Sequence, residues 1–142
     1  MVSKTISGIF RAIAKILEIK GENVFRVRAY ERAAQNIESL SEDIQDIINE
    51  NRLERIPGIG SDLARKIIEI TKTGKLEFFE ELKKSIPEGL LELLRIPSVG
   101  PKHAKLFYEA LGIKSVKGLE KSAKAGKLLG LEGVKEKTVE NI

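Results

Sequence analysis

The chain has 142 residues, is 42% hydrophobic and carries a formal net charge of +4, with a sequence pI near 9.3. This length holds one compact domain or two small ones, and the mild positive charge permits binding to a polyanion without requiring it. The absence of cysteine excludes disulfides and thiolate metal sites and fits a reducing compartment. No apolar run approaches the about 20 residues of a membrane span, and the N-terminus lacks the core of a signal peptide. We therefore expect a soluble, cytoplasmic protein without a membrane partner.

Apolar residues recur at three- and four-residue steps between residues 6 and 19, which predicts an amphipathic helix. Ser3 is its expected N-cap and Gly21 its expected end. A second helix is predicted over residues 23–37. Its expected buried residues are Phe25, Ala29, Ala33, Ala34 and Ile37. The segment Ser39-Leu40-Ser41-Glu42 has the pattern of a capping box, which would open a third helix.

Further helices are predicted at residues 61–71 and 75–85, and no convincing strand is found. The chain is therefore expected to be all-α, with two small helical subdomains over residues 1–86 and 87–142. The boundary is placed at Pro87, because proline disfavours a helical conformation of the residue before it.

The second subdomain begins with a predicted helix at residues 88–95. Pro101 suits the first turn of the next helix, Gly112 its end, and Ser115 the N-cap of the helix after that. The sequence stops at Ile142, at most two turns into a last helix, so we expect a truncated third hairpin and a longer parent chain.

One five-residue motif is repeated along the chain. Ile56-Pro57-Gly58-Ile59-Gly60 returns as Ile96-Pro97-Ser98-Val99-Gly100 and, more faintly, as Leu131-Glu132-Gly133-Val134-Lys135. Each copy places a tight turn before a new helix, and glycine is expected there because the turn needs backbone angles that a Cβ would obstruct. The first N–H groups of the following helix have no intrahelical partner and lie at its positive end, a combination that binds phosphate. The repeat is the helix-hairpin-helix pattern, which contacts DNA backbone rather than bases.

Residues in and just after these turns are the candidates for contact with DNA phosphates. In the turns they are Gly58, Gly60, Ser98, Gly100 and Gly133. Ser98 replaces the first glycine of the second copy, and Lys135 replaces the second glycine of the third. Lys102 and Lys105 follow the second turn and could add long-range attraction to the backbone. The alternative is a tight helix connection that only packs.

A longer series of segments, in a fixed order, goes beyond the hairpins. They are Lys20-Gly21-Glu22-Asn23-Val24-Phe25-Arg26-Val27-Arg28-Ala29-Tyr30, Ala33-Ala34, Pro57-Gly58-Ile59-Gly60, Ala64-Arg65-Lys66-Ile67, Thr73-Gly74-Lys75-Leu76, Leu91-Glu92-Leu93-Leu94-Arg95-Ile96-Pro97 and Leu111-Gly112-Ile113-Lys114-Ser115. In these segments the chain resembles the N-terminal region of family X DNA polymerases, the family of DNA polymerase beta, in its bacterial and archaeal form. The resemblance covers essentially the whole chain.

The resemblance implies a division of labour. Residues 1–84 would correspond to a small lyase domain that grips the 5′-phosphate at a DNA gap, and residues 88–142 to a subdomain that holds the duplex behind the primer end. The polymerase palm, with its two divalent metals, lies downstream in the family and is absent here. We expect no DNA synthesis by this chain alone, no required cofactor, and further polymerase domains in a longer chain.

The family also binds Na⁺ or K⁺ through backbone carbonyls of its hairpins. The corresponding carbonyls here would be those of Glu54, Ile56, Ile59, Leu94, Ile96 and Val99. Carbonyl oxygens suit a hard cation, but such a site leaves no side-chain signature.

Lys66 aligns with the family's lyase nucleophile, whose amine attacks C1′ of a 5′-deoxyribose phosphate to form a Schiff base. The step needs a neutral amine, whereas a free lysine has a pKa of about 10.4. The alternative is an ordinary ion pair with Asp62, four residues earlier on the same helix. Asp62 also departs from the family, since DNA polymerase beta has a phosphate-binding lysine there. An acid at this position would repel a 5′-phosphate and keep Lys66 charged.

Two residues of the second predicted helix complete the lyase expectation. By resemblance, Arg26 matches a lysine that contacts the 5′-phosphate and Tyr30 a tyrosine that lines the lyase pocket. Arginine suits phosphate because its planar fork can donate two parallel hydrogen bonds. Arg26 belongs to a basic group with Arg28 and Arg32, in which Arg28 and Arg32 share a face and Arg26 lies to one side. The alternative is a solvated helix face with a half-buried tyrosine.

The favoured function is non-sequence-specific binding to gapped or 5′-phosphorylated DNA in gap-filling base excision repair, with 5′-deoxyribose-phosphate lyase activity through Lys66. A first alternative is a noncatalytic tandem helix-hairpin-helix module, which would bind duplex regardless of a 5′-phosphate. A second is a helical protein–protein interaction domain, which would show no salt-sensitive DNA binding.

Overall fold

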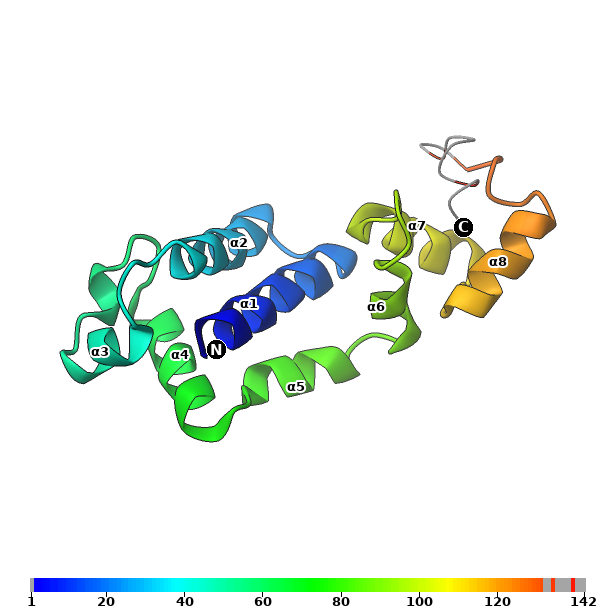
Figure 1. Cartoon of the computed structure of the whole chain (residues 1–142). Coiled ribbons are helices and arrows are strands. Elements are labelled where there is room, and N and C mark those ends of the chain that lie inside the picture. Colours follow the sequence, from blue (N-terminus) through cyan, green and yellow to red (C-terminus); the bar gives the residue numbers. More distant parts are fainter. Residues whose placement is uncertain (1, 132–133, 135–138, 140–142) are drawn as a thin grey trace.

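The computed structural model describes residues 2–131, 134 and 139. Within these residues the protein is built of helices and contains no strand, which confirms the all-α prediction (Figure 1). The elements in chain order are α1 (Val2–Ile19), α2 (Val24–Glu38), α3 (Ile44–Asn49), the short 3₁₀ helix η1 (Leu53–Arg55), α4 (Ser61–Thr73), α5 (Glu77–Lys84), α6 (Gly89–Leu93), α7 (Pro101–Leu111) and α8 (Val116–Lys124). None of the described helices is long and apolar enough to cross a bilayer.

Helices α1 and α2 form the most extensive helix pair and lie side by side (Figure 1). The chain reverses between them at Gly21, whose φ of +74° lies in the left-handed region that glycine adopts at little cost. The side chain of Asn23 then caps α2 by accepting the N–H of Phe25 at 2.8 Å. The predicted end of α1 is confirmed, whereas the predicted cap at Ser3 is wrong because Ser3 lies inside α1.

The buried face of α2 differs from the predicted one. Phe25 is 74% exposed and Ala29 is also exposed, so their predicted burial is wrong. The residues that α2 buries are Val27, Tyr30, Ala33, Ala34 and Ile37. These follow three- and four-residue steps along the face that meets α1, and Phe25 and Ala29 lie outside that face.

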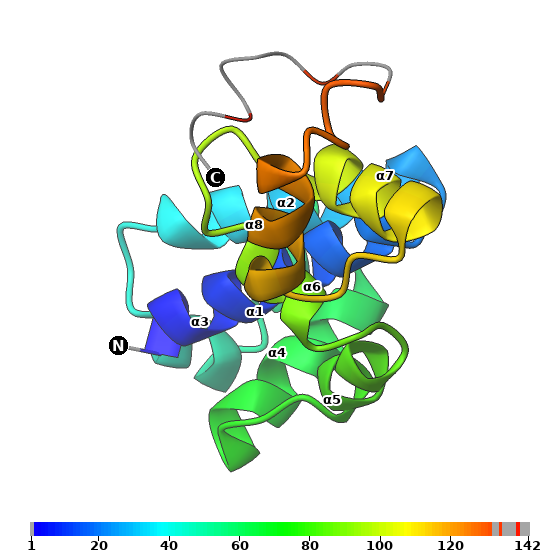
Figure 2. The ribbon, with the colours of Figure 1, turned by 90° about the vertical axis from the view of Figure 1, so that its right-hand side faces the viewer.

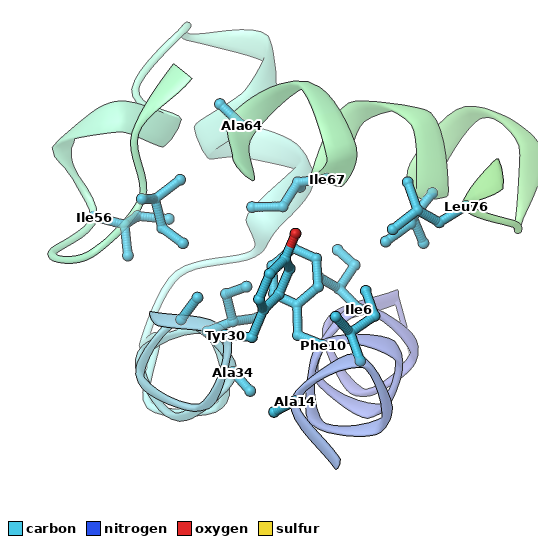
Figure 3. Close-up of a cluster of buried hydrophobic side chains, with 14 of the residues drawn as sticks. Ile6, Phe10, Ala14, Tyr30, Ala34, Ile56, Ala64, Ile67 and Leu76 are labelled. Carbon is cyan, nitrogen blue, oxygen red and sulfur yellow. The ribbon is translucent and has the colours of Figure 1, made fainter. Parts of the chain in front are cut away.

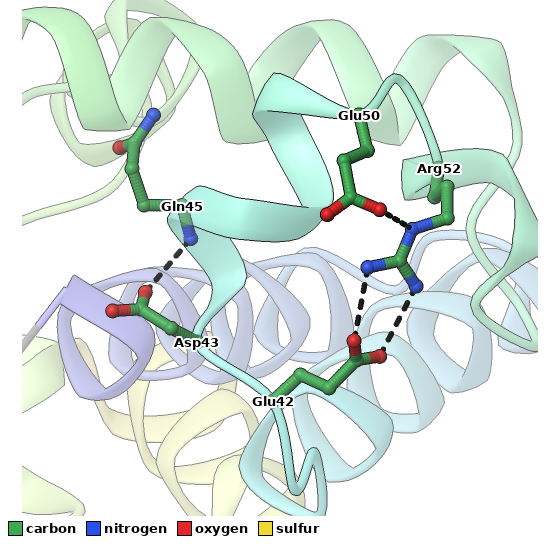
Figure 4. Close-up of polar contacts among 5 residues, drawn as sticks. All are labelled: Glu42, Asp43, Gln45, Glu50 and Arg52. Carbon is green, nitrogen blue, oxygen red and sulfur yellow. Dashed lines mark hydrogen bonds and ion pairs between the residues drawn. The ribbon is translucent and has the colours of Figure 1, made fainter.

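Helix α3 begins at a different cap from the predicted one. Asp43 caps it by accepting the N–H of Gln45 at 2.9 Å (Figure 4). Ser39 instead ends α2, where its hydroxyl donates to the carbonyl of Gln35 at 2.9 Å. The predicted capping box is therefore wrong, because Ser39 terminates one helix rather than starting the next.

Arg52 fastens the segment that leads into the first hairpin (Figure 4). Its two terminal nitrogens donate to both carboxylate oxygens of Glu42, at 2.9 and 3.1 Å, and its Nε donates to Glu50 at 2.8 Å. The hydrogen bond and charge of Arg52 hold the pKa of the Glu42 carboxyl below its usual value, against a small opposing effect of burial. This bidentate pair ties the start of α3 to the residue just before η1.

Buried side chains form two clusters. The first joins α1 and α2 to α4 through residues such as Phe10, Tyr30 and Ile67 (Figure 3). The second gathers Leu90, Phe107 and Leu119 of α6, α7 and α8, together with Ile19 from the end of α1. Ile86 packs against both clusters. The division at residues 86 and 87 stays a prediction, since α1 contributes to both cores.

Helix α7 lies beside the C-terminal end of α1 in both views (Figures 1 and 2). Lys105 of α7 reaches this end, since a Cβ built on Gly21 would lie 2.6 Å from its Nζ. The ammonium therefore lies near the negative end of the α1 dipole, which favours a cation.

Helix α6 approaches the chain before α8 more closely than any side chain would allow. A Cβ built on Gly89 would lie 2.0 Å from the carbonyl oxygen of Lys114. Downstream, the predicted helix end at Gly112 is confirmed by its left-handed conformation, and the predicted cap at Ser115 by its hydroxyl, which accepts the N–H of Gly118 at 3.0 Å.

Candidate nucleic-acid interface

The first two copies of the repeated motif have the same backbone geometry. The N–H of Ile59 donates to the carbonyl of Ile56 at 3.0 Å, and that of Val99 donates to Ile96 at 3.0 Å. The residue inside each turn has a positive φ, +84° at Gly58 and +72° at Ser98. Sequence alone suggested this equivalence, and the structure shows that serine adopts the left-handed conformation that glycine has in the first copy.

Each turn runs directly into a helix. Gly60 precedes α4 and Gly100 precedes α7, and neither helix has a side-chain hydrogen bond at its cap. The carbonyls of Gly60 and Gly100 accept the N–H groups of Ala64 and Ala104, at 2.9 and 3.0 Å. The N–H groups before these have no acceptor within the helix and point out at its positive end.

Gly60 and Gly100 are not required by the fold. Their φ and ψ, −94° and −170° for Gly60 and −99° and −175° for Gly100, are extended values that any residue adopts. A Cβ added at either position would meet nothing within 4 Å. The expectation that the turn's own angles demand glycine therefore holds for Gly58, with its positive φ, and is wrong for these two. What glycine provides at positions 60 and 100 is an open approach to the backbone.

Each turn is braced by a different side chain. Asn36 of α2 donates from Nδ2 to the carbonyl of Pro57 at 2.6 Å, and Nδ1 of His103 lies 2.9 Å from the carbonyl of Ser98. The His103 ring is parallel to that of Phe107, with centroids 5.8 Å apart. These braces fix the direction of the two turns relative to the helices behind them.

Of the basic residues near the turns, Arg32 and Lys102 lie at a turn and Lys105 does not. Arg32 of α2 is exposed, and its stem reaches the first turn, where a Cβ on Gly58 would lie 3.6 Å from its Cγ and Cδ. Lys102 is exposed just after the second turn, whereas the Nζ of Lys105 lies near Gly21. Sequence reasoning placed Arg32 in a basic group of the second helix, with a solvated face as the alternative, and missed its place at the first turn. Gly133, of the third copy, lies outside the described residues.

A second set of candidates meets around the ring of Phe78, at the start of α5. The Nζ of Lys66 lies 4.8 Å from the ring centroid, and the guanidinium carbon of Arg26 lies 5.5 Å from it. Tyr30 stacks on the same ring at 6.3 Å, and Phe10 meets Tyr30 edge-on at 5.6 Å. The structure thus brings together the three residues that the resemblance selected, from α2 and α4. We call Arg26, Lys66 and Phe78 the cationic cluster.

Asp62 joins the cationic cluster through Lys66. The carboxylate accepts a hydrogen bond from Nζ of Lys66 at 2.6 Å and lies 3.6 Å from Nη2 of Arg65. The hydrogen bond from Lys66 holds the pKa of the Asp62 carboxyl below its usual value, with help from the charges of Lys66, Arg65 and Arg26 and against partial burial. The expected ion pair is present. It is not an ordinary surface pair, because the Lys66 side chain is only 15% exposed while that of Asp62 is 65% exposed.

Phe78 is the residue of this cluster that sequence reasoning missed. The only signal was its place among the few aromatic residues of the chain, which has five phenylalanines and two tyrosines. Its contact with Tyr30 joins α5 to α2, which is far away in the sequence. The apolar periodicity within one helix cannot reveal such a contact.

Carboxylate or histidine metal sites are not found among the described residues, where no group of three or more such side chains could hold an ion. The carbonyls of Ile56 and Ile96, two of the predicted cation ligands, each accept one N–H. A carbonyl oxygen has a second lone pair, so these hydrogen bonds leave one lone pair on each oxygen unused, and the cation site stays a prediction.

Comparisons with known proteins agree with these two hairpins. A family model described as "Helix-hairpin-helix domain" matches residues 1–76, and one described as "SAM-like Helix-hairpin-helix tandem" matches residues 90–142. The chain is 32% identical over all 142 residues to the protein named DNA polymerase/3′-5′ exonuclease PolX from Bacillus subtilis (strain 168). It spans 24% of the length of that relative, at its N-terminal end. The predicted resemblance to the N-terminal region of a family X polymerase is thereby confirmed, and the chain belongs to the helix-hairpin-helix domain family.

Proposed function

We propose that this chain grips the sugar–phosphate backbone of DNA at its two described hairpins, without reading base sequence. The observation that carries the proposal is the pair Gly60 and Gly100, where the fold has no need of glycine and the space beside the backbone is open. Family membership and similarity to a polymerase support DNA as the ligand.

Phosphate oxygens would accept hydrogen bonds from the first N–H groups of α4 and α7, at the positive ends of these helices. Arg32 at the first turn and Lys102 after the second would add charge without base specificity. Two hairpins in one chain would contact the backbone at two places, so their modest individual affinities would combine. The carbonyls of Glu54, Ile56, Ile59, Leu94, Ile96 and Val99 are the candidates for holding Na⁺ or K⁺, which would offset phosphate charge at the turns.

The cationic cluster would receive the 5′-phosphate at a gap. Arg26 of the cluster and Arg65 beside Asp62 would supply guanidinium groups, and Phe78, with Tyr30 stacked on it, would form an apolar wall beside Lys66. Burial of the Lys66 stem would hold its amine in one place, as a nucleophile requires. The lyase reaction would then take place at Lys66. The neutral amine adds to C1′ of the open-chain sugar, and water leaves to give an imine. A C2′ proton passes to solvent and the C3′–O bond breaks, so that the 3′ oxygen leaves on the 5′-phosphate of the downstream strand. Water then hydrolyses the imine, which releases the unsaturated sugar phosphate and restores the amine.

The biological setting would be gap filling in repair, within a longer polymerase. The chain spans about a quarter of a relative whose name describes a polymerase and a 3′-5′ exonuclease, and those activities are properties of that protein. This chain would supply the grip on DNA and the contact with the 5′ end.

Binding is tested by fluorescence anisotropy with labelled gapped DNA, at several salt concentrations and in two unrelated sequences. We expect equal affinity for both sequences and a linear fall of log affinity with log salt, since each neutralised phosphate releases counterions. Strong preference for one sequence, or no binding at about 0.1 M salt, would overturn the proposal.

The lyase step is tested by borohydride trapping on gapped DNA with a 5′-deoxyribose phosphate. A covalent adduct in the parent chain that is lost in Lys66→Ala would assign the amine. Lys72→Ala, at an exposed lysine of the same helix, is the matched control and should leave the adduct unchanged. Absence of an adduct while DNA is bound would leave the noncatalytic DNA-binding module.

A further inference from the structure

An anion, Asp62, already lies against the cationic cluster. The carboxylate of Asp62 lies 2.6 Å from Nζ of Lys66 and 3.6 Å from Nη2 of Arg65, and its pKa responds to the charge of Arg26 as well. The carboxylate therefore pairs with two cations of α4, and the charge of Arg26 on α2 also acts on it. These are the groups that a 5′-phosphate would have to approach.

The side chains of Lys66 and Asp62 differ in how freely they can move. The Lys66 side chain is 15% exposed and lies 4.8 Å from the centre of the Phe78 ring, so its position is held by packing. The Asp62 side chain is 65% exposed at the start of α4, where rotation about its own bonds would carry the carboxylate into solvent. The pair would thus open by movement of Asp62 rather than of Lys66.

We propose that Asp62 is a specificity-determining residue that competes with the 5′-phosphate for the cationic cluster and withholds Lys66 until it is displaced. Asp62 offers the cluster a single negative charge, whereas a terminal phosphate is close to a dianion at neutral pH. Binding of a 5′-phosphate requires the carboxylate to leave, and its departure frees the amine of Lys66 from its counter-ion. A 5′-hydroxyl end is uncharged, so it can bind while the carboxylate of Asp62 stays in place. The parent chain consequently discriminates weakly between a 5′-phosphate and a 5′-hydroxyl, although Arg26 and Lys66 are both cations.

Helix stability alone could also explain an acidic residue at position 62, because a carboxylate in the first turn of a helix interacts favourably with the positive end of the helix dipole. That explanation predicts that removing the charge lowers helix stability and leaves the choice between DNA ends unchanged. Competition predicts a change in the preference for a 5′-phosphate over a 5′-hydroxyl. The two explanations are therefore separated by the ratio of the affinities for these two DNA ends, and not by either affinity alone.

The inference rests on the proposed function and is tested with Asp62→Asn in the full chain. Dissociation constants are measured for two gapped DNAs that differ only in a 5′-phosphate or a 5′-hydroxyl at the gap. We expect the preference for the phosphate to rise about tenfold in Asp62→Asn, as removal of a like charge from a close anion site allows. Asp62→Glu, which keeps the charge, should retain the parent's weak preference.

Asp46→Asn on α3 changes net charge by the same amount outside the cationic cluster. We expect it to tighten binding to both DNAs slightly and equally. The yield of borohydride-trapped adduct at Lys66 should rise in Asp62→Asn and stay unchanged in Asp46→Asn. An equal effect of both variants on the two DNAs, or a lower phosphate preference in Asp62→Asn, would overturn the role of Asp62 while leaving DNA binding intact. Failure of the parent chain to bind either DNA would overturn the proposed function and this inference together.

Discussion

Gly60 and Gly100 occupy the same place in two successive turns, with φ and ψ of −94° and −170° in the first and −99° and −175° in the second. Neither conformation needs glycine, and no atom lies within 4 Å of where a Cβ would stand. The fold would accept alanine at both positions. Glycine there is best explained by something outside the protein that must come close to the backbone, and a DNA phosphate is that group in our proposal.

Gly60→Ala and Gly100→Ala should separate folding from binding. We expect each variant to keep its free energy of unfolding within about 0.5 kcal/mol of the parent, because the site is open and the backbone unstrained. Affinity for gapped DNA should fall about tenfold in each, since a methyl group would hold the phosphate away from the N–H groups. Urea unfolding and fluorescence anisotropy measure the two effects.

Gly8→Ala is the control for this pair, since Gly8 is exposed on α1 and has no atom within 4 Å of a Cβ. Its DNA affinity should equal that of the parent. Normal binding by both turn variants would mean that the open backbone serves no ligand.

Substitutions at the equivalent positions 58 and 98 should change the free energy of unfolding in opposite directions. Ser98 has a φ of +72° without being glycine, so Ser98→Gly should raise the free energy of unfolding by about 0.5–1 kcal/mol. Gly58→Ala places a Cβ at a φ of +84° and should lower it by about 1 kcal/mol. Thermal and urea unfolding of both variants check the pair, and a loss of stability in Ser98→Gly would show that its side chain contributes more than its backbone costs.

Much of the fold could be predicted because the signals are local. Proline at position 101, glycine at 112 and serine at 115 mark helix ends through backbone conformation and capping, which depend on few neighbours. The predicted burial of Phe25 is wrong because an apolar residue at the first turn of α2 fits two faces of that helix. The choice between them is made by packing on α1, which a single helix does not encode.

The candidate site could be predicted only in part. The turn glycines follow from the repeated motif, and Lys66, Arg26 and Tyr30 follow from family resemblance. Phe78 and Arg32 could not be found, because each gains its place through a contact between helices distant in sequence. The sequence predicted the ion pair of Asp62 with Lys66 from their spacing, whereas the burial of Lys66 needed the structure.

Gly89→Ala should loosen the second cluster. A Cβ at this position would lie 2.0 Å from the carbonyl oxygen of Lys114, so α6 and the chain before α8 would have to move apart. Overpacking of this kind costs about 1–3 kcal/mol. We expect urea unfolding to show that loss, with NMR shifts concentrated around Leu90 and Leu119. An unchanged unfolding curve would mean that these backbones are not in contact in solution.

The Arg52 bridge should contribute stability that depends on pH. The pKa of the Glu42 carboxyl is lowered in the folded state, so the contribution is complete above the ordinary glutamate pKa of about 4.3 and is lost as pH falls through the lowered value. Arg52→Ala should therefore be less stable than the parent at pH 7, and the difference should shrink below pH 4. Unfolding curves across this range provide the check, and a constant difference would show that packing of Arg52, rather than its ion pair, is responsible.

The proposed grip of the two turns on DNA is tested most directly by two-dimensional ¹H–¹⁵N NMR of the labelled chain during titration with gapped DNA. The largest shifts should fall on the backbone N–H groups of Gly58, Gly60 and Ser61 in the first turn and of Ser98, Gly100 and Lys102 in the second. Both groups should move over the same range of DNA concentration, because the hairpins bind one backbone together. Shifts confined to the lysines of α8, with the N–H groups of both turns unmoved while DNA is bound, would contradict the proposed interface.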